Sequence, residues 1–306
     1  MRLAFVLALV AASAACDLGK VTVRTTSKVL LRAQPALQQE SDYELARQAI
    51  PGALKTVEGF WIVDPDNANL IRILTEGYCQ YGIGFVEDDW EAAKLKQDLE
   101  AAEYHNDRAT KMFTRCLNYA LRSLGPRWQR DLFGNQDTVA VLLRELGGPP
   151  RRFAMMYAGV ALGSLINHNL TRTEMLAYVP TVQQVLEHVL ELDKRRPEPD
   201  LAHAALPHIA LGMLHSGRPK ALGGDPERAR HHFEEALRIT GNKFLLARTL
   251  MAIRIGLMIN DRKFFHDQLK LVLETSPAVW PEQRLANEVA HRKARRYLSN
   301  EKELFQ

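Results

Sequence analysis

Hydrophobic positions recur at three- and four-residue steps along most of this chain. The clearest example is GGDPERARHHFEEALRITG at 223–241, where Ala229, Phe233 and Ala236 fall on one face of a helix. Asp225 precedes that helix at the position where an aspartate caps the free amides of the first turn. The small side chains of Ala229 and Ala236 let a partner helix approach closely at two positions along this face, and the larger Phe233 fills the space between them. The pattern predicts the second helix of a tetratricopeptide-like hairpin.

The same spacing occurs in two other places, each after another apolar segment that can supply the partner helix. The matching residues are Ala109, Phe113 and Cys116, and then Phe265, Leu269 and Val272. Strand signals are scarce, and the only candidate strand is the segment Val21–Leu31. We therefore predict an all-α fold of tetratricopeptide-like helical hairpins, stacked into a single solenoid-like domain that needs no second core.

The first fifteen residues have the features of a secretory signal peptide. Arg2 gives a positive start, an apolar run follows, and Ser13-Ala14-Ala15 supplies small residues for cleavage. Cys16 comes directly afterwards, which predicts a bacterial lipoprotein acylated on that sulfur, with ordinary cleavage after Ala15 as the alternative. We expect a signal peptide at 1–15, a lipidated tether at 16–40 and a helical-repeat domain at 41–306.

The charge of the chain argues against a nucleic-acid partner. The formal net charge is +4, from 40 basic and 36 acidic residues, and removal of the leader with Arg2 leaves +3. Arg292, Lys293, Arg295 and Arg296 are clustered, but on a helix they point in several directions and meet nearby glutamates. We expect a mixed, solvated surface and no nucleic-acid binding.

Two further cysteines, Cys79 and Cys116, fall inside predicted helices. Single cysteines on apolar helix faces are more often buried free thiols, and this is the interpretation that we favour. A bridge between them is the alternative, because an exported protein enters an oxidising compartment.

The segment ANLIRILTEGYCQYGIGFVED at 68–88 is apolar on nearly every side, yet it contains three glycines. Each glycine inside a helix costs about 1 kcal/mol relative to alanine, so this backbone is expected to lie close to a neighbouring helix or a ligand. Tyr78, Tyr81 and Phe85 form an aromatic stripe on this segment at three- and four-residue steps.

A second segment, from 152 to 167, is likewise apolar and rich in small residues, and it contains Met156 and Tyr157. Aromatic side chains with a polar tip and adaptable methionines suit the lining of a groove. Our candidate groove, for a ligand or a partner, is Tyr78, Tyr81, Phe85, Met156 and Tyr157. The alternative is that helix packing uses the whole stripe as core.

Catalytic and metal-binding motifs are missing from the sequence. There is no HExxH pattern, no cysteine pair at zinc spacing, no Gly-x-Ser-x-Gly elbow and no glycine-rich phosphate loop. His231 and His232 could each meet Glu235 on a helix, but matching ligands are not found on another helix, and we expect both histidines on a mostly solvated face. We predict no catalytic residue, no metal and no cofactor.

Four stretches of the chain together resemble one protein family. They are DPDNANLIRILTEGYCQYGIGFVED, YALRSLG, ALGGDPERARHHFEEAL and RLANEVAHRKARRYL, and the similarity extends from about Asp42 to Phe305. The family is the T component (TatT) of the tetratricopeptide-repeat-associated TRAP transporters, which are bacterial periplasmic lipoproteins. The resemblance implies an all-helical repeat fold, a solute-binding P component as partner, and a role beside a TRAP permease.

The expected function is therefore non-enzymatic. We expect a periplasmic protein, anchored to a bacterial membrane through Cys16, that binds a solute-binding protein and assists TRAP-type uptake. The alternative is a stand-alone carrier of a small apolar or organic-acid ligand in a cavity between helices. Whether the protein forms a homo-oligomer stays open at this point.

Overall fold

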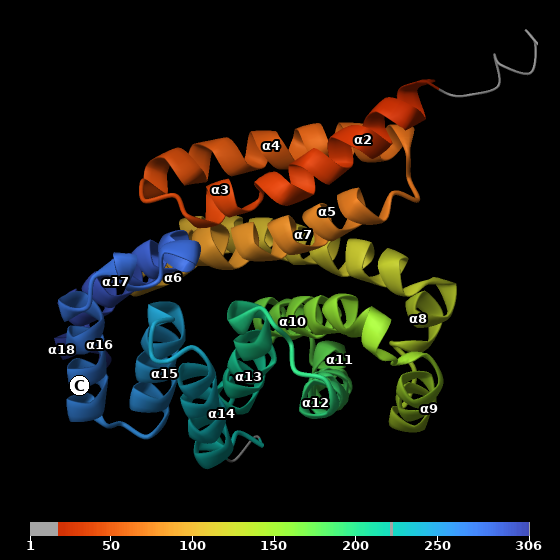
Figure 1. The fold of residues 1–306 in the computed structure, drawn as a ribbon. Coiled ribbons are helices and arrows are strands. Elements are labelled where there is room, and N and C mark those ends of the chain that lie inside the picture. Colours follow the sequence, from red (N-terminus) through yellow and green to blue (C-terminus); the bar gives the residue numbers. More distant parts are fainter. Residues whose placement is uncertain (1–17, 221–222, 306) are drawn as a thin grey trace, which may run out of the picture.

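The computed structural model describes residues 18–220 and 223–305, so the predicted signal peptide and Cys16 lie outside the described residues. All regular elements in the described ranges are helical, in agreement with the predicted all-α class (Figure 1). In the first half they are α2 (Leu18–Ala33), α3 (Pro35–Gln38), α4 (Tyr43–Val63), α5 (Ala68–Tyr81), the π-helical turn η1 (Gly82–Val86), α6 (Glu87–Leu95), α7 (Leu99–Leu124), α8 (Pro126–Asp131), α9 (Gln136–Leu146), η2 (Pro149–Arg151) and α10 (Arg152–His168). In the second half they are α11 (Thr173–Leu176), α12 (Val179–Arg195), α13 (Leu201–Ser216), α14 (Pro226–Ile239), α15 (Leu245–Met258), α16 (Arg262–Glu274), η4 (Pro277–Val279), η5 (Pro281–Gln283), α17 (Arg284–Ser299) and α18 (Glu301–Leu304).

Aspartates define the starts of several long helices. The residue before the first helical position accepts a hydrogen bond from a backbone N–H of the first turn, which satisfies a donor that the helix itself leaves unpaired. The aspartates that do this are Asp42, Asp98, Asp200, Asp225 and Asp261. The cap predicted at Asp225 is therefore confirmed, and it accepts from the amides of Glu227 and Arg228.

The three predicted stripes are all buried. Ala229, Phe233 and Ala236 are completely inaccessible, and the same is true of the other two sets, Ala109, Phe113 and Cys116, and Phe265, Leu269 and Val272. Each of the three helices packs against a neighbour in sequence or space, as α14 does on α13, α16 on α15, and α7 on α5 and α10. The stripe on α14 therefore packs closely against its partner helix, because the ring of Phe233 lies directly against the backbone of Gly212 in α13.

The candidate strand at Val21–Leu31 does not form, because these residues belong to the helix α2. Much of the region expected as a tether is likewise helical, in α2 and α3. Val23 and Ser27 are buried where α2 packs on α5 and α4. One short apolar run with β-branched residues fits either a strand or a helix, and here tertiary packing selects the helix.

The helices form layers (Figure 1). Helices α2 and α4 lie on one side of α5 and α7, and the hairpins from α10 to α16 follow one another on the other side. The last long helix, α17, returns to the beginning of the domain, where it packs against α3, α4 and η1 as well as α15 and α16. The chain therefore brings its N-terminal and C-terminal thirds into direct contact.

Candidate functional site

A cavity of about 360 Å³ lies where the N-terminal helices, α13, α15 and α17 meet. Most of its wall is aliphatic or aromatic, and the side chains come from segments distant in sequence. They include Leu30, Ile50, Leu54, Val57, Ile73, Phe85, Leu206, Phe244, Leu246, Leu285 and Val289. An apolar wall of this kind is typical of sites for small ligands.

One end of the cavity is polar, and its centre is the buried carboxylate of Glu76 on α5. Its Oε1 lies 3.1 Å from Nε2 of His203 on α13 and accepts a 2.9 Å hydrogen bond from the side-chain amide of Gln80. Gln34 donates to the other oxygen, Oε2, at 3.5 Å. Since an ionised carboxylate only accepts hydrogen bonds, the arrangement places donors on both oxygens of Glu76.

Pairing with Glu76 raises the pKa of the His203 imidazole. Burial lowers the pKa of His203, but the hydrogen bond and negative charge of Glu76 raise it more, so the net pKa lies above its ordinary value. The hydroxyl of Tyr157 lies 3.5 Å from the same Nε2. Burial and the charge of Glu76 raise the pKa of Tyr157 well above its usual range, so this phenol stays neutral.

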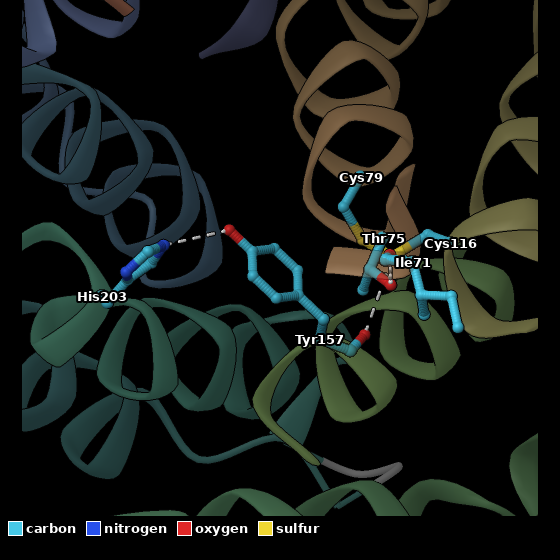
Figure 2. Close-up of a disulfide and its surroundings, with 6 residues drawn as sticks. All are labelled: Ile71, Thr75, Cys79, Cys116, Tyr157 and His203. Atoms are coloured by element: carbon cyan, nitrogen blue, oxygen red, sulfur yellow. Dashed lines mark hydrogen bonds between the residues drawn. A yellow bond between two sulfur atoms is a disulfide. The ribbon is translucent and has the colours of Figure 1, made fainter. Parts of the chain in front are cut away.

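A disulfide lies on the other side of Tyr157 (Figure 2). Cys79 on α5 and Cys116 on α7 are bonded, with 5.4 Å between their Cα atoms, and Sγ of Cys116 is 3.9 Å from the carbonyl oxygen of Tyr157. The prediction of free thiols is therefore wrong. Both cysteines fall on the buried faces of two helices that pack side by side, which gives the short Cα separation that a disulfide requires.

The structure brings together three of the five candidate groove residues. Tyr81, Phe85 and Tyr157 line the cavity, and the rings of Tyr81 and Phe85 are stacked at 5.3 Å. Tyr78 is stacked instead on Tyr119, on the side of α5 near Trp61 of α4. Met156 is fully buried, with its sulfur 3.3 Å from Arg152.

The three glycines of this segment have different surroundings. A Cβ atom at Gly77 would lie 2.5 Å from a methyl carbon of Leu54, and one at Gly82 would lie 2.9 Å from the ring of Phe113. Close helix packing therefore explains these two positions. A Cβ at Gly84 would meet only a methyl of Val289 at 3.7 Å, an ordinary contact, and Gly84 lines the cavity.

A second cavity of about 140 Å³ lies beside the first. Five side chains line both spaces: Ile83, Val160, Leu206, Phe244 and Leu246. These shared side chains give the two cavities a common apolar boundary. Charged residues also reach the second cavity, among them Glu87, Glu91 and Lys293.

An ion cluster around the buried Asp88 joins two of the sequence motifs, GFVED and RLANEVAHRKARRYL. Asp88, at the end of the first motif, lies 2.6 Å from Nη2 of Arg296 and 2.9 Å from Nε of Arg292. Lys293 binds Glu91 at 2.7 Å and lies 3.8 Å from Asp88. Burial raises the pKa of Asp88, but these cations lower it more, so its net pKa is below the ordinary value. Three of the four clustered basic residues thus serve to hold α17 on α6.

The expectation that His232 lies on a solvated face is wrong, because its side chain is buried. Its Nδ1 is 3.1 Å from Nδ1 of His208, and its ring is stacked on His215 at 5.7 Å. Burial, followed by the nearby positive potential of His208, His215 and His231, lowers the pKa of His232 to about 3. The buried surface of α14 therefore extends beyond the stripe of Ala229, Phe233 and Ala236 and includes His232.

Sequence reasoning missed Glu76, His203 and Gln80. A signal for Glu76 was present, since it is the only acidic residue of α5 and sits on a helix that is apolar on nearly every side. A buried carboxylate needs a partner. The identity of that partner depends on how α13 crosses α5, and helical periodicity does not contain that information.

Two negative findings apply to residues 18–220 and 223–305. No group of three or more histidine, cysteine, aspartate or glutamate side chains is arranged to hold a metal ion. None of the helices in the same ranges combines the length and hydrophobicity that a membrane span needs.

Comparison with known proteins identifies a family and a relative. The family model described as TRAP transporter T-component matches residues 39–305. The chain is also 24% identical over 270 residues to an uncharacterized protein of Treponema pallidum (strain Nichols), an alignment that covers 84% of this chain and 78% of the relative.

Proposed function

Because the chain belongs to the T-component family of TRAP transporters, we propose that it binds the solute-binding P component of such a transporter and assists solute uptake. The observation that carries the proposal is the extent of the family match, which includes nearly all of the helical domain. The helical hairpins, which we interpret as tetratricopeptide-like and stacked as a solenoid, provide the extended surface that repeat proteins use to bind partners.

The proposed location is the periplasm, with the chain held at a bacterial membrane through an acylated Cys16. The leader at 1–15 supports export. The disulfide between Cys79 and Cys116 supports it independently, because disulfides persist in oxidising compartments and are rare in the cytosol. A Cys16→Ser variant should leave the membrane fraction or stay unprocessed, whereas wild type entirely in the soluble periplasmic fraction would contradict the anchor.

The proposed partnership is tested by affinity purification of the tagged chain from its native envelope. We expect a solute-binding protein of the TRAP class to co-purify, and deletion of the chain to reduce uptake of that protein's solute. Recovery of the chain without any such protein, together with unchanged uptake, would contradict the proposal.

The cavity supports a second candidate function, in which the chain itself holds a small ligand. Its apolar wall fits the body of such a molecule, and the buried carboxylate of Glu76 fits an end group that donates hydrogen bonds. A free carboxylate on the ligand would meet a like charge at this position. Between the two ligand types expected from the sequence, apolar and organic-acid, the cavity therefore favours the apolar one.

A matched pair of glycine substitutions tests this second function. Gly84→Leu places a side chain in the cavity, whereas Gly59→Leu puts the same side chain on an exposed part of α4 with nothing within 4 Å. With the neutral fluorophore N-phenyl-1-naphthylamine as probe, we expect Gly84→Leu to lose binding and Gly59→Leu to keep it, at similar melting temperatures. Equal binding by both variants would place the probe elsewhere, and a lowered melting temperature for Gly84→Leu alone would show that position 84 is core.

A further inference from the structure

Helix α2 presents a row of basic side chains on the outside of the protein. Lys20, Arg24, Lys28 and Arg32 follow one another at four-residue steps, all four are exposed, and α2 contains no acidic residue. Like charges at this spacing lie next to each other on a helix and destabilise it when it is isolated. Asp64 offsets this repulsion at the Lys20 and Arg24 end of the row, and an anionic surface would offset it at Lys28 and Arg32.

The same exposed side of α2 also contains large apolar residues. Leu18 is 76% exposed, Val21 is 51% exposed and Val29 is 63% exposed. The opposite side of α2, with Val23 and Ser27, is buried against the protein. The helix therefore has apolar side chains on two sides. Those on one side are buried, and those among the basic residues on the other side are exposed.

Helix α4 lies beside one end of this surface. Nε of Arg24 lies 3.1 Å from Asp64, so the N-terminal half of α2 runs beside the C-terminal end of α4, where Ile62 is 71% exposed. In Figure 1 these two helices form the outer layer on the upper side of the molecule, away from the later hairpins. The acidic side chains at this end are paired with arginines, Asp64 with Arg24 and Asp66 with Arg122.

We propose that this outer face of α2, made of Leu18, Lys20, Val21, Arg24, Lys28, Val29 and Arg32, lies on an anionic phospholipid surface. An amphipathic helix that combines exposed apolar side chains with lysine and arginine binds in the plane of the lipid headgroups. Basic residues at such a surface are attracted by the negative potential of acidic lipids.

The position of this face in the chain favours a membrane over a protein partner. Cys16, the proposed acylation site, is two residues before Leu18. Acyl chains attached there would keep the face within reach of the bilayer. The face goes beyond the proposed anchor, since acylation attaches the chain, whereas the α2 surface orients the whole domain with α2 and α4 toward the lipid and the later hairpins away from it.

The test uses the mature chain with Cys16→Ser, so that no acyl group contributes to binding. We expect it to sediment with vesicles of phosphatidylglycerol and phosphatidylcholine, to bind vesicles of phosphatidylcholine alone more weakly, and to be released by salt. The double variant Lys28→Gln/Arg32→Gln should bind the anionic vesicles roughly thirtyfold more weakly, because each basic side chain at such a surface contributes about a factor of five.

The matched control is Lys111→Gln/Arg195→Gln, which removes the same charges from exposed positions of α7 and α12. It should bind like the Cys16→Ser parent, and circular dichroism should show that both double variants remain folded. Three results would overturn the proposal: no binding to anionic vesicles at low salt, equal weakening by the two double variants, or loss of the solute-binding protein from the Lys28→Gln/Arg32→Gln variant with vesicle binding unchanged. The last result would identify the face as a protein-binding surface.

Discussion

The buried carboxylate of Glu76 and the imidazole of His203 lie 3.1 Å apart, although 127 residues separate them in the chain. The pair joins α5 to α13 at the polar end of the cavity. Because both groups are largely removed from water, the interaction affects the stability of the fold as well as the chemistry of the site.

The first prediction concerns the pH dependence of this pair. The pKa of His203 is raised in the folded protein above its ordinary value of 6.5, so the stabilisation is fully present below pH 6.5 and is lost as the pH rises through the folded pKa. Glu76→Gln should remove this loss, and it should reduce stability at pH 5.5 by about 1.5–3 kcal/mol, as expected for a hydrogen bond to a charged group. Urea unfolding at pH 5.5 and pH 8.5 measures both effects. An unchanged pH dependence in the variant would show that Glu76 does not control His203.

The second prediction concerns the disulfide. Cys79→Ala/Cys116→Ala should lower the free energy of unfolding by about 3–4 kcal/mol, because the bridge restricts the unfolded chain across a sequence separation of 37 residues. Dithiothreitol should destabilise wild type by a similar amount and leave the double variant unaffected. Titration of two free thiols in the denatured, unreduced protein from the periplasm would contradict the bridge.

The third prediction concerns the centre of the C-terminal hairpins. Phe233 is fully buried against α13, so Phe233→Ala should cost roughly 3–5 kcal/mol of stability. Leu271→Ala on the exposed side of α16 is the control, and it should change stability by less than about 0.5 kcal/mol. Chemical denaturation measures both values, and similar costs would mean that burial does not determine the effect.

The fourth prediction concerns acid stability. The pKa of His232 is lowered from 6.5 to about 3 in the folded protein, so between these pH values the unfolded chain binds the proton more readily. Stability should therefore fall on acidification from pH 6.5, with a limiting slope of about 1.4 kcal/mol per pH unit from this one group.

His232→Gln tests the acid effect, because glutamine keeps a polar side chain and does not titrate. The slope of unfolding free energy against pH between 6 and 4 should become smaller in the variant. His208 and His215 also have lowered pKa values and contribute in the same direction, so part of the slope should remain. A slope that stays as steep as in wild type would show that His232 protonates normally.

Local periodicity was sufficient to predict much of the helical fold. The stripe of Ala229, Phe233 and Ala236 lies within one helix, and the capping role of Asp225 depends only on the residues that follow it. The same local reasoning failed for His232, because its burial comes from His208 and His215 on α13. A partner helix that covers a wide arc buries residues next to the stripe as well as the stripe itself.

The site was harder to predict than the fold, because it depends on crossings between distant helices. Tyr81 and Tyr157 were identified as candidate lining residues from their chemical type and their small neighbours. Tyr78 has the same chemical type, yet its position on α5 places its ring against Tyr119. The bond between Cys79 and Cys116 likewise depends on the register of α5 against α7, which no spacing within a single helix reveals.

The return of α17 to the start of the domain has a consequence for how the protein unfolds. In an open stack of repeats, contacts are limited to neighbours, so the last repeat can fray while the others stay folded. Here Asp88 in α6 is held by Arg292, 204 residues later, and the buried Lys293 and the half-buried Arg296 strengthen the same junction. Helix α17 cannot detach without exposing this charged junction, so α6 and α17 should unfold together in one cooperative transition. Truncation before α17 would leave Asp88 buried without its cations and should destabilise the N-terminal helices, although none of them would have been removed.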